Sequence, residues 1–175
     1  DKATGTIFGQ NGWTKSINYF KSKGYTNAEL YATTWGDANM SNAAQKYHSK
    51  AYLLYVRKFI EAVLDYTDAE KVDIITHSMG VTLTRKAIKG GVAFDDVENV
   101  FFDLGMPLTN KIDAFVGIAG ANKGLTSCYV TNGNTPTCNR INGFYPGNTS
   151  NNGLSEFLLD LNQTSHFEGN YVYSI

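Results

Sequence analysis

The feature of this sequence that most constrains its fold is a strand that runs directly into a helix. Residues 72–76 form a short apolar run between polar residues, and a turn around Ser78 follows without a break. Residues 79–89 then have a helical pattern, which ends at Gly90. Short apolar runs of this kind are typical of strands in a parallel sheet. With further strands and helices in alternation, this unit predicts an α/β fold with a mostly parallel sheet.

The serine at this junction is the main candidate for chemistry. A tight turn between strand and helix lifts the Ser78 hydroxyl away from the backbone, and the helix that begins at Met79 directs N–H groups and its positive dipole end at the same point. This geometry suits acyl transfer, with Ser78 attacking a carbonyl carbon and the Met79 N–H donating to the oxyanion. The alternative is a serine that caps an ordinary helix.

The residues around Ser78 depart from the usual Gly-x-Ser-x-Gly pattern, because Thr76 takes the place of the first glycine. A β-branched residue fits there only if its side chain packs beside Gly80. We therefore expect Thr76 and Gly80 to pack the turn, with Ser78 as its reactive group.

The remaining pattern is one of helices and strands in alternation within a single domain, residues 1–175. We expect helices at 13–23, 51–66 and 154–161, and strands at 29–35, 112–118 and 171–175. Residues 94–107 are expected to be a surface excursion, and 120–152 a long loop rich in Gly, Asn and Thr. The aromatic residues of that loop either line an acyl pocket or hold the loop in place; they are Tyr129, Phe144 and Tyr145.

Composition excludes several classes of function. A formal net charge of -1 gives no electrostatic reason to expect a nucleic acid partner. The apolar runs are shorter than the about 20 residues of a membrane span, and the first ten residues lack the pattern of a signal peptide. The three histidines are scattered and no Cys-x-x-Cys occurs, so no metal site is predicted. The acidic residues 95–98 favour a solvated turn over a calcium site.

Cysteine and asparagine usage bears on the compartment. Cys128 and Cys138 flank a polar loop, and a disulfide between them would indicate an oxidising compartment; two free thiols in a cytosolic protein are the alternative. Three sequons make Asn39, Asn148 and Asn162 candidates for glycosylation. Together these features favour a secreted glycoprotein.

Several stretches resemble the class 2 lipases, a family that includes minimal bacterial lipases and secreted nematode lipase-like proteins. The resemblance lies in residues 70–81, in 30–36, in 115–125, and in Cys128, Cys138 and 143–147; the later stretches are also similar to an extracellular polyhydroxybutyrate depolymerase. It implies an α/β-hydrolase fold with helices on both faces of the sheet and a minimal lipase-like core. It also implies ester substrates, a role in lipid catabolism, and no metal or organic cofactor. For His77 it implies a place that packs the turn or lines the site, and not the role of the base.

The same resemblance implies parts that the given chain lacks. In the family a strand that ends in His-Gly precedes the position of Asp1, the triad acid follows the strand at 171–175, and the triad histidine lies further on. We therefore expect the first core strand, the acid and the base outside the given chain, as a separate chain or another segment of the same protein. His166, the one histidine after Ser78, is expected at the surface, and His48 is expected to be solvated.

These observations predict a secreted serine carboxylic-ester hydrolase of the lipase or esterase type, acting on lipid or aliphatic polyester through an acyl-enzyme on Ser78. The alternative is a secreted structural or binding protein that keeps the lipase scaffold without catalysis. A full sequence without an acid and a histidine beyond Ile175 would favour this alternative.

Overall fold

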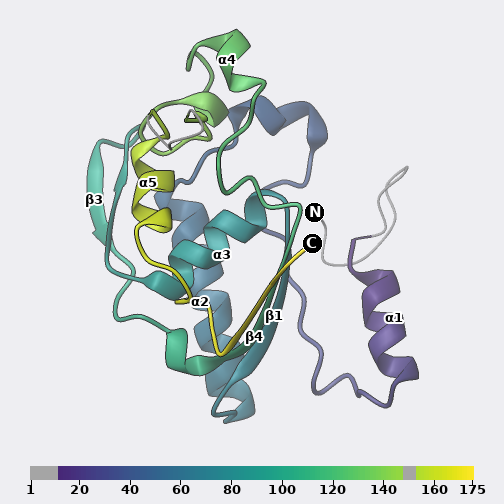
Figure 1. Cartoon of the computed structure of the whole chain (residues 1–175). Coiled ribbons are helices and arrows are strands. Elements are labelled where there is room, and N and C mark those ends of the chain that lie inside the picture. Colours follow the sequence, from purple (N-terminus) through teal and green to yellow (C-terminus); the bar gives the residue numbers. More distant parts are fainter. Residues whose placement is uncertain (1–11, 148–152) are drawn as a thin grey trace. The chain divides into compact units, whose positions relative to one another are not determined.

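The computed structural model describes residues 12–147 and 153–175, which divide into a unit that ends at Asn39 and a second unit, Met40–Ile175 (Figure 1). The first unit contains the predicted helix, α1 (Thr14–Ser22). The strand predicted at 29–35 is wrong, because these residues run without regular secondary structure. Residues with strand propensity form a strand only where a neighbouring strand supplies the ladder of hydrogen bonds.

The second unit is built on a parallel sheet of three strands in the order β1-β4-β5. The strands are β1 (Val72–His77), β4 (Ile112–Ile118) and β5 (Tyr171–Ser174). All three were expected from their apolar runs, and both pairings are parallel. The resulting mixed α/β architecture is compatible with the predicted fold class.

Two helices supply a large part of the core beside this sheet. α2 (Lys50–Thr67) packs against α3 (Met79–Lys89), and α3 in turn packs against β1 (Figure 1). Ten consecutive residues of α3, from Met79 to Ile88, are buried, so this helix is held from all sides. In the part of the chain that the structure describes, no helix is both long and apolar enough to cross a membrane.

Residues 94–107 lie mostly at the surface, as expected, but most of them form a regular antiparallel hairpin of β2 (Val92–Asp95) and β3 (Val100–Asp103), which was not expected. The cross-strand pair Phe94–Phe101 stabilises it, with ring centroids 4.7 Å apart. Asp95 holds the turn, because its Oδ1 accepts the backbone N–H groups of Val97 and Glu98, both at 3.1 Å. Asp95 is fully buried, so the acidic turn is solvated only in part.

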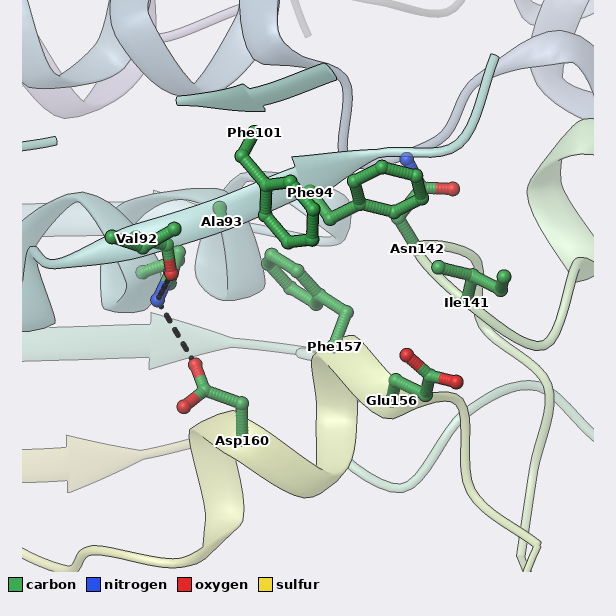
Figure 2. Close-up of a pocket in the computed structure, with 10 residues that line it drawn as sticks. Val92, Ala93, Phe94, Phe101, Ile141, Asn142, Glu156, Phe157 and Asp160 are labelled. Atoms are coloured by element: carbon green, nitrogen blue, oxygen red, sulfur yellow. Dashed lines mark hydrogen bonds and ion pairs between the residues drawn. The ribbon is translucent and has the colours of Figure 1, made fainter. Parts of the chain in front are cut away.

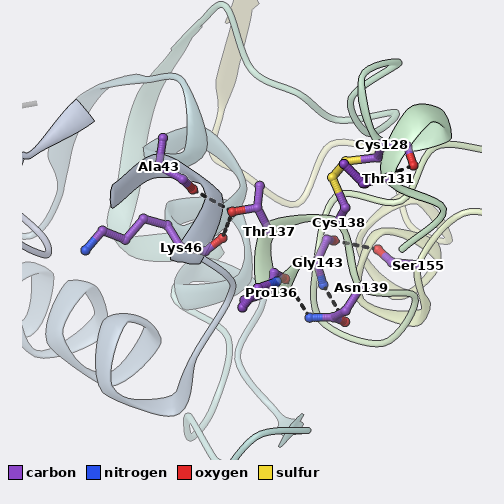
Figure 3. Close-up of a disulfide and its surroundings, with 10 residues drawn as sticks. All are labelled: Ala43, Lys46, Cys128, Thr131, Pro136, Thr137, Cys138, Asn139, Gly143 and Ser155. Atoms are coloured by element: carbon purple, nitrogen blue, oxygen red, sulfur yellow. Dashed lines mark hydrogen bonds between the residues drawn. A yellow bond between two sulfur atoms is a disulfide. The ribbon is translucent and has the colours of Figure 1, made fainter. Parts of the chain in front are cut away.

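The long loop after β4 is a cross-linked structure of its own (Figure 3). The predicted disulfide between Cys128 and Cys138 is present and joins α4 (Cys128–Thr131) to a 3₁₀ helix, Pro136–Cys138. Asn139 tightens the next turn by accepting three backbone N–H groups, and a Cβ at Gly143 would lie 2.5 Å from the Asn139 nitrogen. The chain then enters α5 (Glu156–Asn162), the predicted short helix.

Candidate functional site

The turn between β1 and α3, residues 76–80, places Ser78 in an unusual backbone conformation. Its φ is 54° and its ψ is −133°, a region that residues with a side chain rarely adopt. Strain of this kind costs about 1–3 kcal/mol and persists where the surrounding structure enforces it, most often at functional sites. The Ser78 side chain is exposed, while the residues that follow it in α3 are buried.

Two other serines show what an ordinary cap looks like in the same molecule. Ser49 and Ser155 precede α2 and α5 with extended backbone, and their side chains accept the N–H groups of Tyr52 and Leu158. Ser78 has neither property: its φ is positive and its side chain makes no capping hydrogen bond. The helix-cap alternative for Ser78 therefore does not describe this turn.

Contacts with the end of β4 hold the turn in place. The Ser78 N–H donates to the Ile118 carbonyl at 2.9 Å, so the serine lies at the carboxyl end of the parallel strands. Val81, in the first turn of α3, packs so closely on this strand end that a Cβ at Gly120 would lie 2.7 Å from one of its methyl groups. Glycine at 120 thus lets the helix approach the strand end, which is where ligands bind in open α/β sheets.

The other predicted residues of the turn lie around Ser78. Met79 is the first residue of α3, and the first N–H groups of a helix lack partners within the helix, so its N–H is suited to bind an anion. Thr76 is buried with its Oγ1 3.4 Å from that of Thr84, so its side chain packs on α3. His77 is half-buried and Gly80 is buried. The predicted packing residues and the candidate oxyanion donor therefore share one turn with Ser78.

His48 is not solvated, contrary to the expectation from its polar surroundings in the sequence. It is fully buried, its Nδ1 lies 2.8 Å from the Asn142 carbonyl, and its Nε2 lies 2.7 Å from Thr82 Oγ1. Its ring stacks on Phe157 with centroids 3.8 Å apart. Burial lowers the pKa of His48 to about 3, and the hydrogen bond to Asn142 opposes this only in part, so the ring is neutral.

The link from His48 to the Ser78 turn was missed by sequence reasoning. With the ring neutral, Nδ1 donates to the Asn142 carbonyl and Nε2 accepts the single proton of the Thr82 hydroxyl, so His48 holds Thr82 in the first turn of α3. Residues 48 and 82 are 34 positions apart, and no local pattern connects them. A buried histidine of this kind is found only from tertiary contacts.

The remaining candidates lie elsewhere. His166 is exposed, as predicted. Phe144 and Tyr145 are buried, with Phe144 against the His48 ring at 4.6 Å, so Phe144 holds the loop in place. Tyr129 is half-exposed and its hydroxyl donates to the Gly147 carbonyl.

Two of the three sequons fall on described residues. Asn39 lies in an exposed stretch. Asn162 is also exposed, but its amide accepts from Arg85 and donates to the Asn122 carbonyl. Asn148 lies outside the described residues.

A comparison with models of protein families identifies the family of this chain. The family model described as "Lipase (class 2)" matches residues 5–175, nearly the whole chain. The chain belongs to the class 2 lipase family. As a class 2 lipase it is a hydrolase of the lipase or esterase type, and lipids or other esters are the substrates that the family implies. The resemblance predicted from residues 70–81 and from the stretches after them is confirmed.

Proposed function

We propose that this class 2 lipase is a secreted serine carboxylic-ester hydrolase with an α/β-hydrolase fold, acting on lipid or aliphatic polyester. The observation that carries the proposal is the strained conformation of Ser78 at the start of a buried helix. The exposed Ser78 side chain makes no capping hydrogen bond and lies at the N-terminus of α3, which is the arrangement that acyl transfer needs.

In the proposed reaction the Ser78 oxygen attacks the ester carbonyl carbon, and its proton passes to a base. The Met79 N–H donates to the oxyanion of the tetrahedral intermediate, supplying half of the oxyanion hole. Collapse of the intermediate releases the alcohol, which takes up the proton, and leaves an acyl ester on Ser78. Water then attacks this ester, the carboxylic acid leaves and Ser78 regains its proton. The triad acid, the base and the second oxyanion donor are proposed to lie outside the given chain.

Two features support secretion. The Cys128–Cys138 disulfide suits an oxidising compartment, and sequons at Asn39, Asn148 and Asn162 are candidate sites for glycans there. Intact mass spectrometry of the purified protein tests for glycans and for a second chain. Either would raise the mass above the 19.3 kDa of the given chain.

The serine mechanism is tested by labelling with a fluorophosphonate. The expected result is one adduct, mapped to Ser78 and absent from Ser78→Ala, together with loss of ester hydrolysis in that variant. Ser127→Ala is the matched control, because Ser127 also precedes a helix without making a capping bond but has an ordinary φ of −58°. It should keep both the adduct and the activity.

Three results would contradict the proposal. An adduct on another serine would assign the nucleophile elsewhere, and unchanged hydrolysis by Ser78→Ala would do the same. A folded protein of full mass with neither adduct nor hydrolysis would favour the inactive scaffold.

A further inference from the structure

A pocket separate from the Ser78 turn lies between the β2–β3 hairpin and α5, although two of its lining residues, Asn142 and Phe157, contact His48 (Figure 2). Its volume is about 260 Å³, somewhat below the about 300 Å³ at which pockets for drug-sized ligands begin. Of its lining residues Lys86 is also on α3, eight positions after Ser78 and so about 12 Å further along the helix axis. The pocket therefore needs an explanation that does not depend on Ser78.

Aromatic rings form the apolar part of the pocket. Phe157 of α5 faces Phe94 and Phe101 of the hairpin, and Val92 and Ile141 extend the apolar wall (Figure 2). Phe157 is buried, but Phe101 is 73% exposed although it is a large apolar side chain. An exposed ring at the mouth of an aromatic pocket gains buried area when a ligand with an apolar body enters.

Asn142 supplies a buried donor at one end of the pocket. The residue is 1% exposed, and among the described residues its Nδ2 has no hydrogen-bond partner. Its orientation is fixed: the Asn139 oxygen accepts three backbone N–H groups, so Asn139 Nδ2 must donate to Asn142 Oδ1, at 2.9 Å. The free group is thus a donor, and in Figure 2 it is turned toward Phe94 while the oxygen points away. A buried donor without a partner destabilises a fold unless something supplies an acceptor.

The charges that line the pocket disfavour an anion as the hydrogen-bond acceptor for Asn142. Lys86 is paired with Asp160 at 3.0 Å and also donates to the Val92 carbonyl. Burial raises the pKa of Asp160, but hydrogen bonds from Lys89 and Lys86 outweigh this and lower it, so Asp160 is a carboxylate. Glu156 adds a second carboxylate, with which no cation pairs in the described part of the chain. The lining therefore carries a net negative charge.

We propose that this pocket binds a small neutral molecule with an aliphatic or single-ring body and one carbonyl or hydroxyl oxygen. The body packs between Phe94, Phe101 and Phe157, and the oxygen accepts a hydrogen bond from Asn142 Nδ2. A six-carbon primary amide has the required size, apolar body and acceptor, and it is not a substrate of an ester hydrolase. Binding does not depend on the proposed function.

The test is a heteronuclear NMR titration of the isotope-labelled full chain with hexanamide. The expected result is a saturable shift of the Asn142 side-chain amide resonances. Phe101→Ala should weaken binding roughly tenfold by removing one wall of the pocket. Val97→Ala is the matched control, because Val97 is a 63% exposed apolar residue at the turn of the same hairpin and does not line the pocket. It should leave the affinity unchanged.

Charged analogues of hexanamide test whether the pocket prefers a neutral ligand. Hexanoate, with the same chain and a negative charge, should bind at least about tenfold more weakly than hexanamide. No saturable shift of the Asn142 amide up to the solubility limit of hexanamide would overturn the proposal and leave water as the acceptor. Equal affinity of Phe101→Ala and the unmodified protein would place binding elsewhere. Tighter binding of hexanoate or of hexylammonium would overturn the choice of a neutral ligand.

Discussion

At the scale of single residues, Ser78 combines backbone strain with an exposed side chain. Its φ of 54° is enforced by the hydrogen bond from its N–H to the Ile118 carbonyl and by the buried helix that follows. Stability is thus given up at the residue that we propose as nucleophile, as is common at sites that must present a reactive group. The free energy that the strain at Ser78 costs can be measured by replacing Ser78 with glycine.

Ser78→Gly is expected to raise the free energy of unfolding by about 1 kcal/mol, because glycine adopts positive φ without steric strain and this outweighs its larger entropy in the unfolded chain. Urea denaturation measures the change. Ser127→Gly is the control: its φ of −58° is unstrained, so the same substitution should lower stability slightly. A loss of stability in both variants would show that Ser78 is not strained.

His48 makes stability depend on pH. Its pKa is about 3 in the folded protein against an ordinary value of 6.5, so between these values the unfolded chain binds a proton that the folded protein does not. The contribution of the neutral His48 to the free energy of unfolding is fully present above pH 6.5. It falls by about 1.4 kcal/mol per pH unit as the pH drops toward 3.

His48→Gln should remove the pH dependence that comes from His48. The test compares urea denaturation of this variant and of the unmodified protein at several pH values from about 7 down to about 4. The readout is the slope of stability against pH, because the substitution also changes packing against Phe157. Carboxylates that titrate in the same range contribute to both proteins and cancel in the difference. Equal slopes would contradict a buried, neutral His48.

At the scale of elements, Asp95 connects the β2–β3 hairpin to α2. One carboxylate oxygen accepts two N–H groups of the hairpin turn, and the other accepts the Lys50 N–H at 2.7 Å, at the first residue of α2. A buried carboxylate that accepts three backbone N–H groups orders both elements at once. The hairpin that forms one wall of the proposed pocket is thereby fixed to the helical core.

Asp95→Asn should lower the free energy of unfolding by about 1–3 kcal/mol, because the amide nitrogen would face the Lys50 N–H or the turn, donor against donor. Thermal unfolding followed by circular dichroism measures the loss. Asp96→Asn, at the exposed neighbouring position, is the control and should change stability by less than about 0.5 kcal/mol. Equal effects of the two substitutions would show that the Asp95 hydrogen bonds do not hold the hairpin.

At the scale of the whole molecule, Arg85 joins segments from across the second unit. From α3 it donates to Glu168 at 2.8 Å, just before β5, and to the Leu161 carbonyl at the end of α5. It also reaches the side chains of Asn122, in the long loop, and Asn162. The planar guanidinium, with five N–H donors, can serve all of these acceptors at once.

Arg85→Lys should lower the free energy of unfolding by about 3 kcal/mol, because one ammonium cannot reach all of these acceptors and the buried Glu168 would be left with fewer partners. Urea denaturation measures this loss of stability. Arg140→Lys is the control, since Arg140 is exposed and lies over the Tyr145 ring at 3.6 Å; its cost should stay below about 1 kcal/mol. A small effect of Arg85→Lys would show that the segments are held by apolar packing alone.

Features that rest on local pattern can be predicted from the sequence alone. The strand that runs into α3, the helices α1, α2 and α5, and the strands β4 and β5 follow from the spacing of apolar residues, and the disulfide follows from two cysteines at the ends of one loop. The family follows from stretches that persist along the chain. Each of these signals is contained within one segment, so it can be read without knowing the segment's neighbours.

Features that need partners distant in the sequence become visible only in the folded chain. No strand forms at 29–35, whereas residues 92–103 pair as a hairpin through Phe94 and Phe101, because a strand exists only where another strand accepts its hydrogen bonds. His48 is buried because Asn142 and Thr82, from remote segments, satisfy its ring nitrogens. The unpaired Asn142 amide, and the pocket it lines, likewise arise from contacts that no local pattern contains.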